Sequence, residues 1–293
     1  MSKAAILNKA TGKKDDEFYT PFAPIERELS NYHDVLRSKK VLCNCRDLDS
    51  NFDLYFRDTF QPMQLCVVGE RHFRTYWEKG DLGLFKHWSE EELKCESFSY
   101  DDYFGKHLLS NYDVVVTNPP FSKIRNFLQT IVEAGKDFIV VAPITAVGNK
   151  AIGNYLVEGK LRVGYTRITE PFLRPDGSEQ KFGNVVWFTS FPVVREKKLK
   201  MTKMLEFDSF DIGYVFYDNL PNVLYVPRAK DIPIDYSGIM SVPLSYLQYH
   251  DDNDFEIVDG RTLHDSEYGI LAGYESKIGG EYKFTRILIR RRT

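Results

Sequence analysis

The chain has 293 residues, of which 43% are hydrophobic and 28% are charged, and its formal net charge is −3. The apolar fraction is too high for a disordered chain, and the sequence contains no collagen-like or heptad repeat. No apolar stretch approaches the roughly 20 residues that span a bilayer, and residues 1–16 hold no apolar signal-peptide core. We therefore expect no membrane partner. Four cysteines do not make a disulfide scaffold in a chain of this length, so we expect a reducing, cytoplasmic location. On its own, the mild acidity argues weakly against a nucleic-acid partner.

Short apolar segments alternate with amphipathic ones from Lys39 onward. Buried strands are predicted where the apolar runs occur, at 39–45, 64–68, 93–98, 112–118 and 137–143. Helices are predicted in the amphipathic stretches, at 24–36, 52–60, 123–135 and 148–158. This alternation is typical of a doubly wound α/β domain with a parallel sheet.

Beyond residue 160 the pattern changes. Residues 161–168 and 183–191 flank a polar loop at 171–182 with no helical pattern between them, which predicts an antiparallel hairpin that closes the sheet. Residues 205–293 are rich in Tyr, Asp and Pro and show no clear helical period, so a small α+β region is expected there. The length allows a core domain of about 190 residues and a smaller appendage.

The segment Asn118-Pro119-Pro120-Phe121 directly follows the valine-rich strand. Ligands bind at the carboxyl ends of strands in an open α/β sheet, and two consecutive prolines make the turn stiff. The Asn118 side-chain oxygen and the Pro119 carbonyl could hold both hydrogens of an exocyclic amine such as that of adenine, and Phe121 could stack on the flipped base. We therefore interpret the turn as a catalytic site for amine methylation. An ordinary proline-rich strand exit is the alternative.

Asn-Pro-Pro-Phe resembles the catalytic motif of amino-methyltransferases that use S-adenosylmethionine. More specifically, several further segments resemble, in order, the EcoRI-type adenine-specific DNA methyltransferases. Together they cover nearly the whole chain: DEFYTP (16–21), VLCNCRD (41–47), SNFDLYF (50–56), NVVWFTS (184–190), YDN (217–219), KDIPIDYSGIMSVP (230–243) and YKFTRILIRRR (282–292).

The resemblance implies a Rossmann-like doubly wound sheet with a terminal antiparallel hairpin, followed by a small C-terminal α+β target-recognition region. The order of the segments is similar to that of gamma-type enzymes, in which the cofactor elements come first and the target-recognition region comes last. We therefore expect a flexible leader at 1–16, an S-adenosylmethionine-dependent catalytic domain at 17–192, and a DNA target-recognition region at 193–293.

The resemblance also implies that Tyr19, Thr20 and Pro21 line the methionine end of the cofactor. The other interpretation is a hydrophobic staple with Thr20 as the helix N-cap and Pro21 as the first helical residue, and both can hold together.

The loop that follows the first strand, residues 43–47, lacks the glycines of the general dinucleotide fingerprint, as it does in the EcoRI-type family. Asp47 is the candidate for a carboxylate near the cofactor's methionine amino group. Asn44 in the same loop and Asn51, which opens the next helix, are further candidates for cofactor contacts. A solvated turn carboxylate is the alternative for Asp47.

Three more acidic residues follow predicted strands. Glu70 comes 23 residues after Asp47, near the spacing at which an acid binds a ribose, and an ion pair with Arg71 is the alternative. Asp101 and Asp102 resemble the acid that reads the cofactor's adenine, and helix capping is the alternative.

The predicted substrate contacts lie later in the chain. Phe182, or else Phe172, is the second aromatic against the flipped base, although a plain hydrophobic plug is the alternative. The candidates for phosphate contacts are Lys197, Lys198, Lys200, Arg286, Arg290, Arg291 and Arg292. A solvated surface, and for the arginine run a frayed tail, is the alternative for them.

Cys43 and Cys45 supply two potential metal ligands, and no nearby His or Cys pair completes a tetrahedral set. We therefore expect no metal, and methyl transfer from a sulfonium needs none.

The function that these observations favour is site-specific methylation of adenine N6 in double-stranded DNA, with S-adenosylmethionine as the methyl donor and base flipping as the route to the amine. A cognate restriction endonuclease that acts on the same site is a further candidate partner. The alternatives are a protein-glutamine or RNA amino-methyltransferase, and a non-catalytic DNA-binding or anti-restriction protein with the same fold. The motifs outweigh the charge argument, because an average over 39 basic and 42 acidic residues says little about one face.

Overall fold

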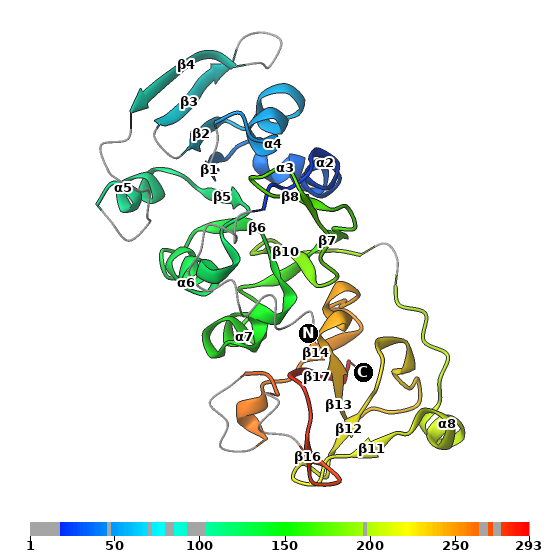
Figure 1. Ribbon diagram of the computed structural model, residues 1–293. Helices are drawn as coiled ribbons and strands as arrows, with labels where there is room; N and C mark the ends of the chain where they lie inside the picture. Colours follow the sequence, from blue (N-terminus) through cyan, green and yellow to red (C-terminus); the bar gives the residue numbers. More distant parts are fainter. Residues whose placement is uncertain are drawn as a thin grey trace. The chain divides into compact units, whose positions relative to one another are not determined.

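The computed structural model describes residues 18–45, 48–69, 72–79, 85–92, 103–195, 198–263, 269–271 and 277–292. The chain forms two compact units (Figure 1). The first consists of the residues up to Pro143 together with Gly164–Phe191, and the second of Ile144–Val163 together with Pro192–Thr293. The predicted leader at 1–16 and the predicted strand at 93–98 lie outside the described residues.

The first unit is built on an eight-stranded mixed sheet with the strand order β4-β3-β2-β1-β5-β6-β10-β7. The central strands β2, β1, β5 and β6 run parallel, whereas β3, β4 and β10 pair antiparallel with their neighbours. The strands are β1 (Lys40–Asn44), β2 (Gln64–Val68), β3 (His72–Lys79), β4 (Phe85–Glu92), β5 (Val114–Thr117), β6 (Asp137–Pro143), β7 (Arg162–Arg167) and β10 (Val185–Thr189). The predicted mixed α/β class is confirmed, as are the strands at 39–45, 64–68, 112–118 and 137–143.

The hairpin of β3 and β4 was not predicted, and it makes one edge of the sheet antiparallel rather than parallel. Most described side chains of β4 are exposed, and those of β3 are largely polar, so neither strand carries the apolar run that marks a buried strand. β3 is a strand because it pairs with β2, in the register that joins Leu65 to Tyr76.

Helices cover both faces of the parallel strands. In Figure 1, α2, α3 and α4 lie on one side of the strands, and α5 and α6 on the other. Alternate strand residues such as Val41 and Val116 pack on the first side with Leu29 and Phe52. The helical segments are α2 (Phe22–Leu29), η2 (Ser30–Tyr32), α3 (His33–Leu36), α4 (Asn51–Leu54), η3 (Tyr55–Thr59), α5 (Tyr103–Asn111), η4 (Phe121–Lys123) and α6 (Ile124–Glu133).

The helix predicted at 52–60 changes geometry along its length, because α4 continues as a π-helical turn, η3. The polar loop predicted at 171–182 contains its own short hairpin of β8 (Phe172–Leu173) and β9 (Glu179–Gln180). β10 and β7, which flank this loop in the sequence, are neighbours at the sheet edge as predicted.

The second unit contains a five-stranded sheet with the order β11-β12-β13-β17-β14 and a separate two-stranded ribbon, β15-β16. Tyr217, Leu220, Val223 and Leu288 contribute to its core. Its strands are β11 (Val215–Phe216), β12 (Val223–Tyr225), β13 (Ile239–Pro243), β14 (Phe255–Ile257), β15 (Lys277–Ile278), β16 (Glu281–Tyr282) and β17 (Arg286–Arg291). Its helical segments are η5 (Ile144–Gly148), α7 (Lys150–Val157), α8 (Leu205–Ile212), η6 (Ala229–Asp231), η7 (Leu244–Gln248) and η8 (Gly260–Thr262). Within the described ranges, no helix is long and apolar enough to cross a membrane.

A buried carboxylate fixes α2 to β7. Glu28 is 0% exposed, and its oxygens accept hydrogen bonds from the backbone N–H groups of Tyr165 and Thr166 at 2.9 and 2.7 Å. The hydroxyls of Thr166 and Tyr32 also donate to it, at 2.6 and 3.0 Å. A Cβ at position 164 would lie 2.2 Å from Glu28 Oε1, so Gly164 is what allows this approach. Four donors on two oxygens satisfy a carboxylate but not an amide.

The variant Glu28→Gln should therefore lower the free energy of unfolding by about 2 kcal/mol, because its amide NH₂ would face donors instead of acceptors. Urea unfolding followed by circular dichroism measures the loss. Glu26→Gln, at an exposed position of the same helix, is the matched control and should unfold like the wild type. An unchanged midpoint for Glu28→Gln would contradict the role assigned to the carboxylate.

Candidate active site

The turn after β5 is held against the end of β1. All four residues of β5 are buried, and the strand ends where Pro119 and Pro120 offer no N–H for pairing. The hydroxyl of Thr117 donates to the backbone carbonyl of Asn44, the last residue of β1. The two predicted site residues Asn44 and Asn118 are thus brought to the carboxyl ends of adjacent parallel strands.

The Asn118 amide is oriented by a backbone group from the N-terminal segment. Its Nδ2 donates to the carbonyl oxygen of Phe18 at 2.5 Å. Its Oδ1 is shielded from solvent and has no hydrogen-bond partner among the described residues. A buried acceptor without a donor is costly, so this oxygen is a candidate position for a donor supplied by a ligand or a water molecule.

Aromatic rings gather beside this amide. The Phe18 ring centroid lies 5.6 Å from that of Phe121 and 4.7 Å from that of Phe182, and the Phe121 and Phe182 centroids are 5.7 Å apart. Phe172 is 1% exposed and packs against Phe182 with the centroids 5.7 Å apart. The structure therefore brings Phe121, Phe182 and Phe172 together and adds Phe18, to which sequence reasoning assigned no role although it lies in the quoted segment DEFYTP.

The segment Tyr19–Pro21 is tied to two other elements. Tyr19 and Leu173 exchange backbone hydrogen bonds at 2.7 and 3.1 Å, which joins the segment to β8. Asn51 Nδ2, at the start of α4, donates to the carbonyl of Thr20 at 2.9 Å. Thr20 is 4% exposed, and its Oγ1 is a second shielded atom with no hydrogen-bond partner among the described residues. Thr20 and Asn51, both predicted to contact the cofactor, are therefore neighbours.

The interpretation of Thr20 as a helix N-cap is wrong. The N-cap of α2 is Pro21, and no side chain there accepts a capping hydrogen bond. Proline can precede the first turn because the first N–H groups of a helix have no intrahelical partner to lose. The Thr20 hydroxyl therefore has no capping role.

Several predicted residues lie outside the described residues, and their roles stay predictions: Asp47, Glu70, Asp101, Asp102 and Lys197. Cys43 Sγ and Cys45 Sγ lie 3.2 Å apart as free thiols. In the described part of the chain, no group of three or more His, Cys, Asp or Glu side chains could hold a metal ion.

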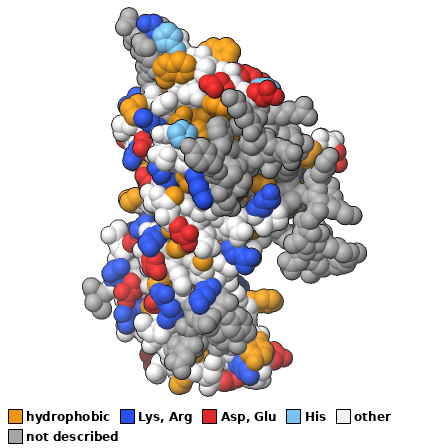
Figure 2. Space-filling model, turned by 90° about the vertical axis from the view of Figure 1, so that its left-hand side faces the viewer, with side chains coloured by type: hydrophobic (Ala, Val, Ile, Leu, Met, Phe, Trp, Pro, Cys, Tyr) orange, Lys and Arg blue, Asp and Glu red, His pale blue; other side chains and the backbone are white. Residues whose placement is uncertain are grey.

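The predicted phosphate contacts in the second unit are mostly paired with other protein groups. Lys198 Nζ lies 2.8 Å from Asp254 and 3.4 Å from Asp251. Arg290 pairs with Glu256 at 2.5 Å, and Arg291 lies over the Phe255 ring and donates to the carbonyl of Pro233. Figure 2 shows the same mixing on one face, where Lys and Arg side chains lie among acidic ones.

Arg286 is a correction to the sequence prediction. It is 6% exposed, its Nε donates to Ser241 Oγ at 2.9 Å, and its guanidinium lies 4.3 Å from the centre of the Tyr225 ring. A side chain buried in this way holds strands together and does not reach a phosphate. The frayed-tail interpretation of the arginine run is also wrong, because β17 is an interior strand between β13 and β14.

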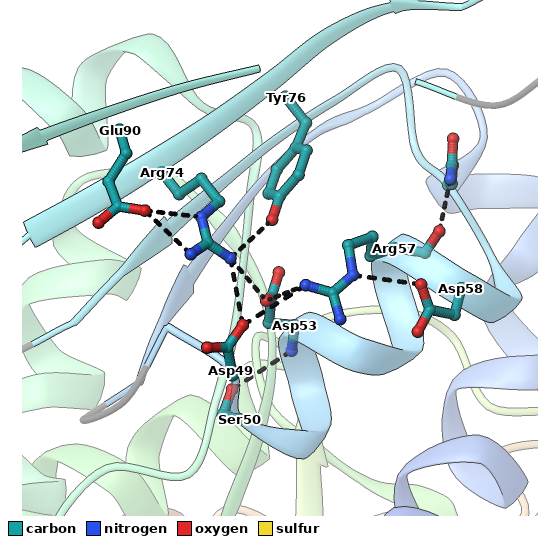
Figure 3. A network of polar contacts seen from close by, with 9 residues as sticks. Asp49, Ser50, Asp53, Arg57, Asp58, Arg74, Tyr76 and Glu90 are labelled. Carbon is teal, nitrogen blue, oxygen red and sulfur yellow. Dashed lines mark hydrogen bonds and ion pairs between the residues drawn. The ribbon is translucent and has the colours of Figure 1, made fainter. Parts of the chain in front are cut away.

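A polar network that sequence reasoning missed joins α4 to the β3–β4 hairpin (Figure 3). Asp53 is 0% exposed, and its Oδ2 lies 3.4 Å from Arg57 and 3.5 Å from Arg74. Arg74 also contacts Glu90 at 2.9 Å and Asp49 at 3.3 Å. Burial raises the pKa of Asp53 from 3.8 to about 6, against the opposing effect of the two arginines. The i,i+4 spacing of Asp53 and Arg57 was the one available signal.

Comparison with known proteins adds to this geometry. The sequence matches the family described as adenine-specific methyltransferase EcoRI over residues 6–103 and 85–292. It is 30% identical to the type II methyltransferase M.EcoRI of Escherichia coli, over 97% of this chain and 96% of that protein. It is also 30% identical to the type II methyltransferase M.MpnI of Mycoplasma pneumoniae, over 86% of this chain and 85% of that protein. No solved structure matches the chain significantly.

The raised pKa of Asp53 predicts how stability varies with pH. An acid whose pKa is higher in the folded chain than in the unfolded chain binds its proton more tightly when folded. The contribution of Asp53 should therefore be fully present below about pH 4 and be lost as the pH rises through about 6. In Asp53→Asn this fall should disappear from a plot of unfolding free energy against pH. Asp34→Asn, at an exposed position of α3 outside this network, should keep it, and parallel curves for wild type and Asp53→Asn would rule the explanation out.

Proposed function

Because the chain belongs to the EcoRI family of adenine-specific methyltransferases, we propose that it methylates N6 of an adenine flipped out of duplex DNA, with S-adenosylmethionine as donor. The observation that carries the proposal is the Asn118 side chain. Its oxygen is a shielded acceptor without a partner, at the carboxyl end of a central strand and beside a group of aromatic rings.

The orientation of Asn118 suits an amine substrate. Since Nδ2 is committed to the Phe18 carbonyl, Oδ1 is the atom that remains for an incoming donor. The lone pair of the adenine amine is delocalised into the ring and is a poor nucleophile. Two acceptors, Asn118 Oδ1 and the Pro119 carbonyl, would hold both N6 hydrogens and direct the lone pair at the methyl group. The step needs an oriented amine and no covalent enzyme intermediate.

The aromatic rings would hold the flipped base. Phe121 follows the catalytic turn, and Phe182 comes from the loop between the sheet-edge strands, so the two rings approach from different segments. Phe172 is buried behind Phe182 and supports it. A flipped base is held by stacking between such rings and by hydrogen bonds to its edge.

The residues present also suit the methyl donor, which supplies an activated methyl on a sulfonium. Its methionine end carries an ammonium group and its sulfur carries a positive charge. Oxygen atoms that act as hydrogen-bond acceptors therefore suit both positions, and neither group needs a proton-abstracting base. Thr20 Oγ1 is a shielded atom that can accept, and Asn51 fixes the Thr20 backbone beside it. Tyr19, Pro21 and Asn44 complete the described part of the proposed donor site, and Asp47, Glu70, Asp101 and Asp102 are its further predicted residues.

Sequence recognition would belong to residues 193–293, with Lys198, Arg290 and Arg291 among the candidates for phosphate contacts. The relatives are named type II methyltransferases, which supports a specific DNA sequence as the target. A restriction endonuclease that cuts the same sequence stays a prediction. The same turn could in principle methylate a protein glutamine or an RNA base, so the assay must include those substrates.

Asn118→Ala should reduce methyl transfer to duplex DNA at least about a hundredfold, because it removes one of two acceptors that orient the amine. Transfer of a labelled methyl group measures the rate, and calorimetry with S-adenosylmethionine should show that donor binding largely persists. Asn126→Ala, at an exposed position of α6, is the matched control. Full activity of Asn118→Ala, or transfer by the wild type to RNA or peptide instead of duplex DNA, would overturn the proposal.

Binding to duplex DNA should weaken steeply as salt rises, since contacts to phosphates release counterions. Fluorescence anisotropy with a labelled duplex at several salt concentrations gives the slope. A binding affinity that does not change with salt would mean that basic side chains do not contact DNA phosphates. The net charge of −3 would then be the better guide to nucleic-acid binding, and the proposal would fail.

A further inference from the structure

The segment YDN (217–219), which the function described above leaves without a role, holds a two-stranded ribbon in the second unit. The two carboxylate oxygens of Asp218 accept from the backbone N–H groups of Gly279 and Gly280, at 3.2 and 2.8 Å. The backbone of Asp218 donates to the carbonyl of Lys277 at 2.9 Å, and Asn219 Oδ1 accepts from the Lys277 N–H at 3.2 Å. Asp218 and Asn219 thus hold the ribbon of β15 and β16 at its turn and along its first strand, and we call these two residues the clamp.

The ribbon's turn has the backbone conformation of a tight hairpin. Gly279 and Gly280 have φ values of 59° and 78°, which L-residues with a side chain rarely adopt. Two consecutive left-handed residues in a two-residue loop are typical of a type I′ turn, whose twist matches that of the flanking strands. The turn therefore has a fixed shape.

The base of the ribbon is fixed as well, through Tyr217. The Tyr217 hydroxyl lies 2.7 Å from Ser241 Oγ, which in turn accepts from Arg286 Nε at 2.9 Å. Arg286 is the first residue of β17, which follows the ribbon directly in the chain. Asp218 and Asn219 therefore hold residues 277–280 directly, and Tyr217 is linked through Ser241 to Arg286, the residue that follows 277–285. Arg286 has this structural role in place of a phosphate contact.

Residues 277–285 expose large aromatic side chains. Phe284 is 92% exposed and Tyr282 is 62% exposed. Lys277 Nζ lies 4.6 Å from the centre of the Tyr282 ring, and Lys283 Nζ lies 3.5 Å from Glu281 in a weak surface pair. β16 lies at one end of the second unit (Figure 1). Two exposed aromatic side chains next to a turn of fixed shape are suited to contact with a partner.

We propose that residues 277–285 form a DNA-contacting ribbon, with Phe284 and Tyr282 against the bases and Lys277 against a phosphate. The inference rests on the proposed function, since it takes duplex DNA as the substrate. The major groove of B-DNA admits a two-stranded β-ribbon, and apolar side chains there contact base edges such as the thymine methyl group. Lysine beside aromatic side chains on one ribbon supplies the complementary charge.

The test compares single variants of the full chain on two duplexes, one with the sequence methylated by the wild type in genomic DNA and one with an unrelated sequence. Phe284→Ala should weaken binding at least about fivefold and methylation at limiting DNA to match, while the thermal midpoint stays that of the wild type, because the side chain is exposed. Lys277→Ala should weaken binding to all duplexes alike and reduce the salt slope by about one unit. Ile234→Ala and Lys230→Ala, at exposed positions of the same unit, are the matched controls.

The clamp provides a second, independent measurement. Asp218→Ala removes both acceptors for the turn and should lower affinity for duplex DNA, whereas Asp218→Asn keeps one acceptor and should restore part of it. Donor binding, followed by calorimetry with S-adenosylmethionine, should not change in any of these variants. If the wild type methylates duplex DNA and Phe284→Ala and Asp218→Ala bind it like the wild type, the ribbon inference is overturned alone. If the wild type neither binds nor methylates duplex DNA, the proposed function fails with it.

Discussion

The arrangement of the candidate active site depends on the buried carboxylate of Glu28. Its four donors come from β7 and from Tyr32, so α2 has one position against the sheet edge. The segment that enters α2 carries Phe18 and Thr20, and its Phe18 carbonyl orients the Asn118 amide. A helix-to-strand contact thus positions the segment whose Phe18 carbonyl accepts from Asn118 Nδ2, which leaves Asn118 Oδ1 as the atom proposed to meet the substrate. Each of these links joins a buried or half-buried polar side chain to the backbone or to a hydroxyl of another element, which is how a site is held within the tolerance that chemistry requires.

The centre of the first unit could be predicted from sequence because it is simple physically. The strand at 114–117 is continuous valine followed by a proline pair, and buried parallel strands have that composition. The β3–β4 hairpin could not be predicted in the same way, since its strands are polar and are defined by pairing with β2. The π-helical turn at 55–59 likewise has no periodic signal, because it replaces a regular turn within an apolar run.

Some site residues could be predicted from the sequence and others could not. Asn118 was identified from its place after a buried strand and the proline pair that follows it, and Thr20 and Asn51 from segments that resemble a family. The fold then ties the segment that holds Phe18 and Thr20 to both Asn118 and Asn51. Arg286 was assigned wrongly, because a charged residue at the start of a strand can face either way and the sequence does not give the register. Its neighbour Arg290 pairs with Glu256 on the adjacent strand β14. Counting basic residues in a terminal run therefore overestimates the charge that is available to DNA.

The backbone pairing of Tyr19 with Leu173 has a thermodynamic consequence. It joins the segment proposed to line the methyl donor and the β8–β9 hairpin, which lies next to the rings proposed to stack on the base, into one connected piece. Any ligand that orders one side of that piece lowers the entropy left to lose on the other side. Donor and target base would then bind with positive cooperativity, and the coupling free energy must be the same whichever of them binds first.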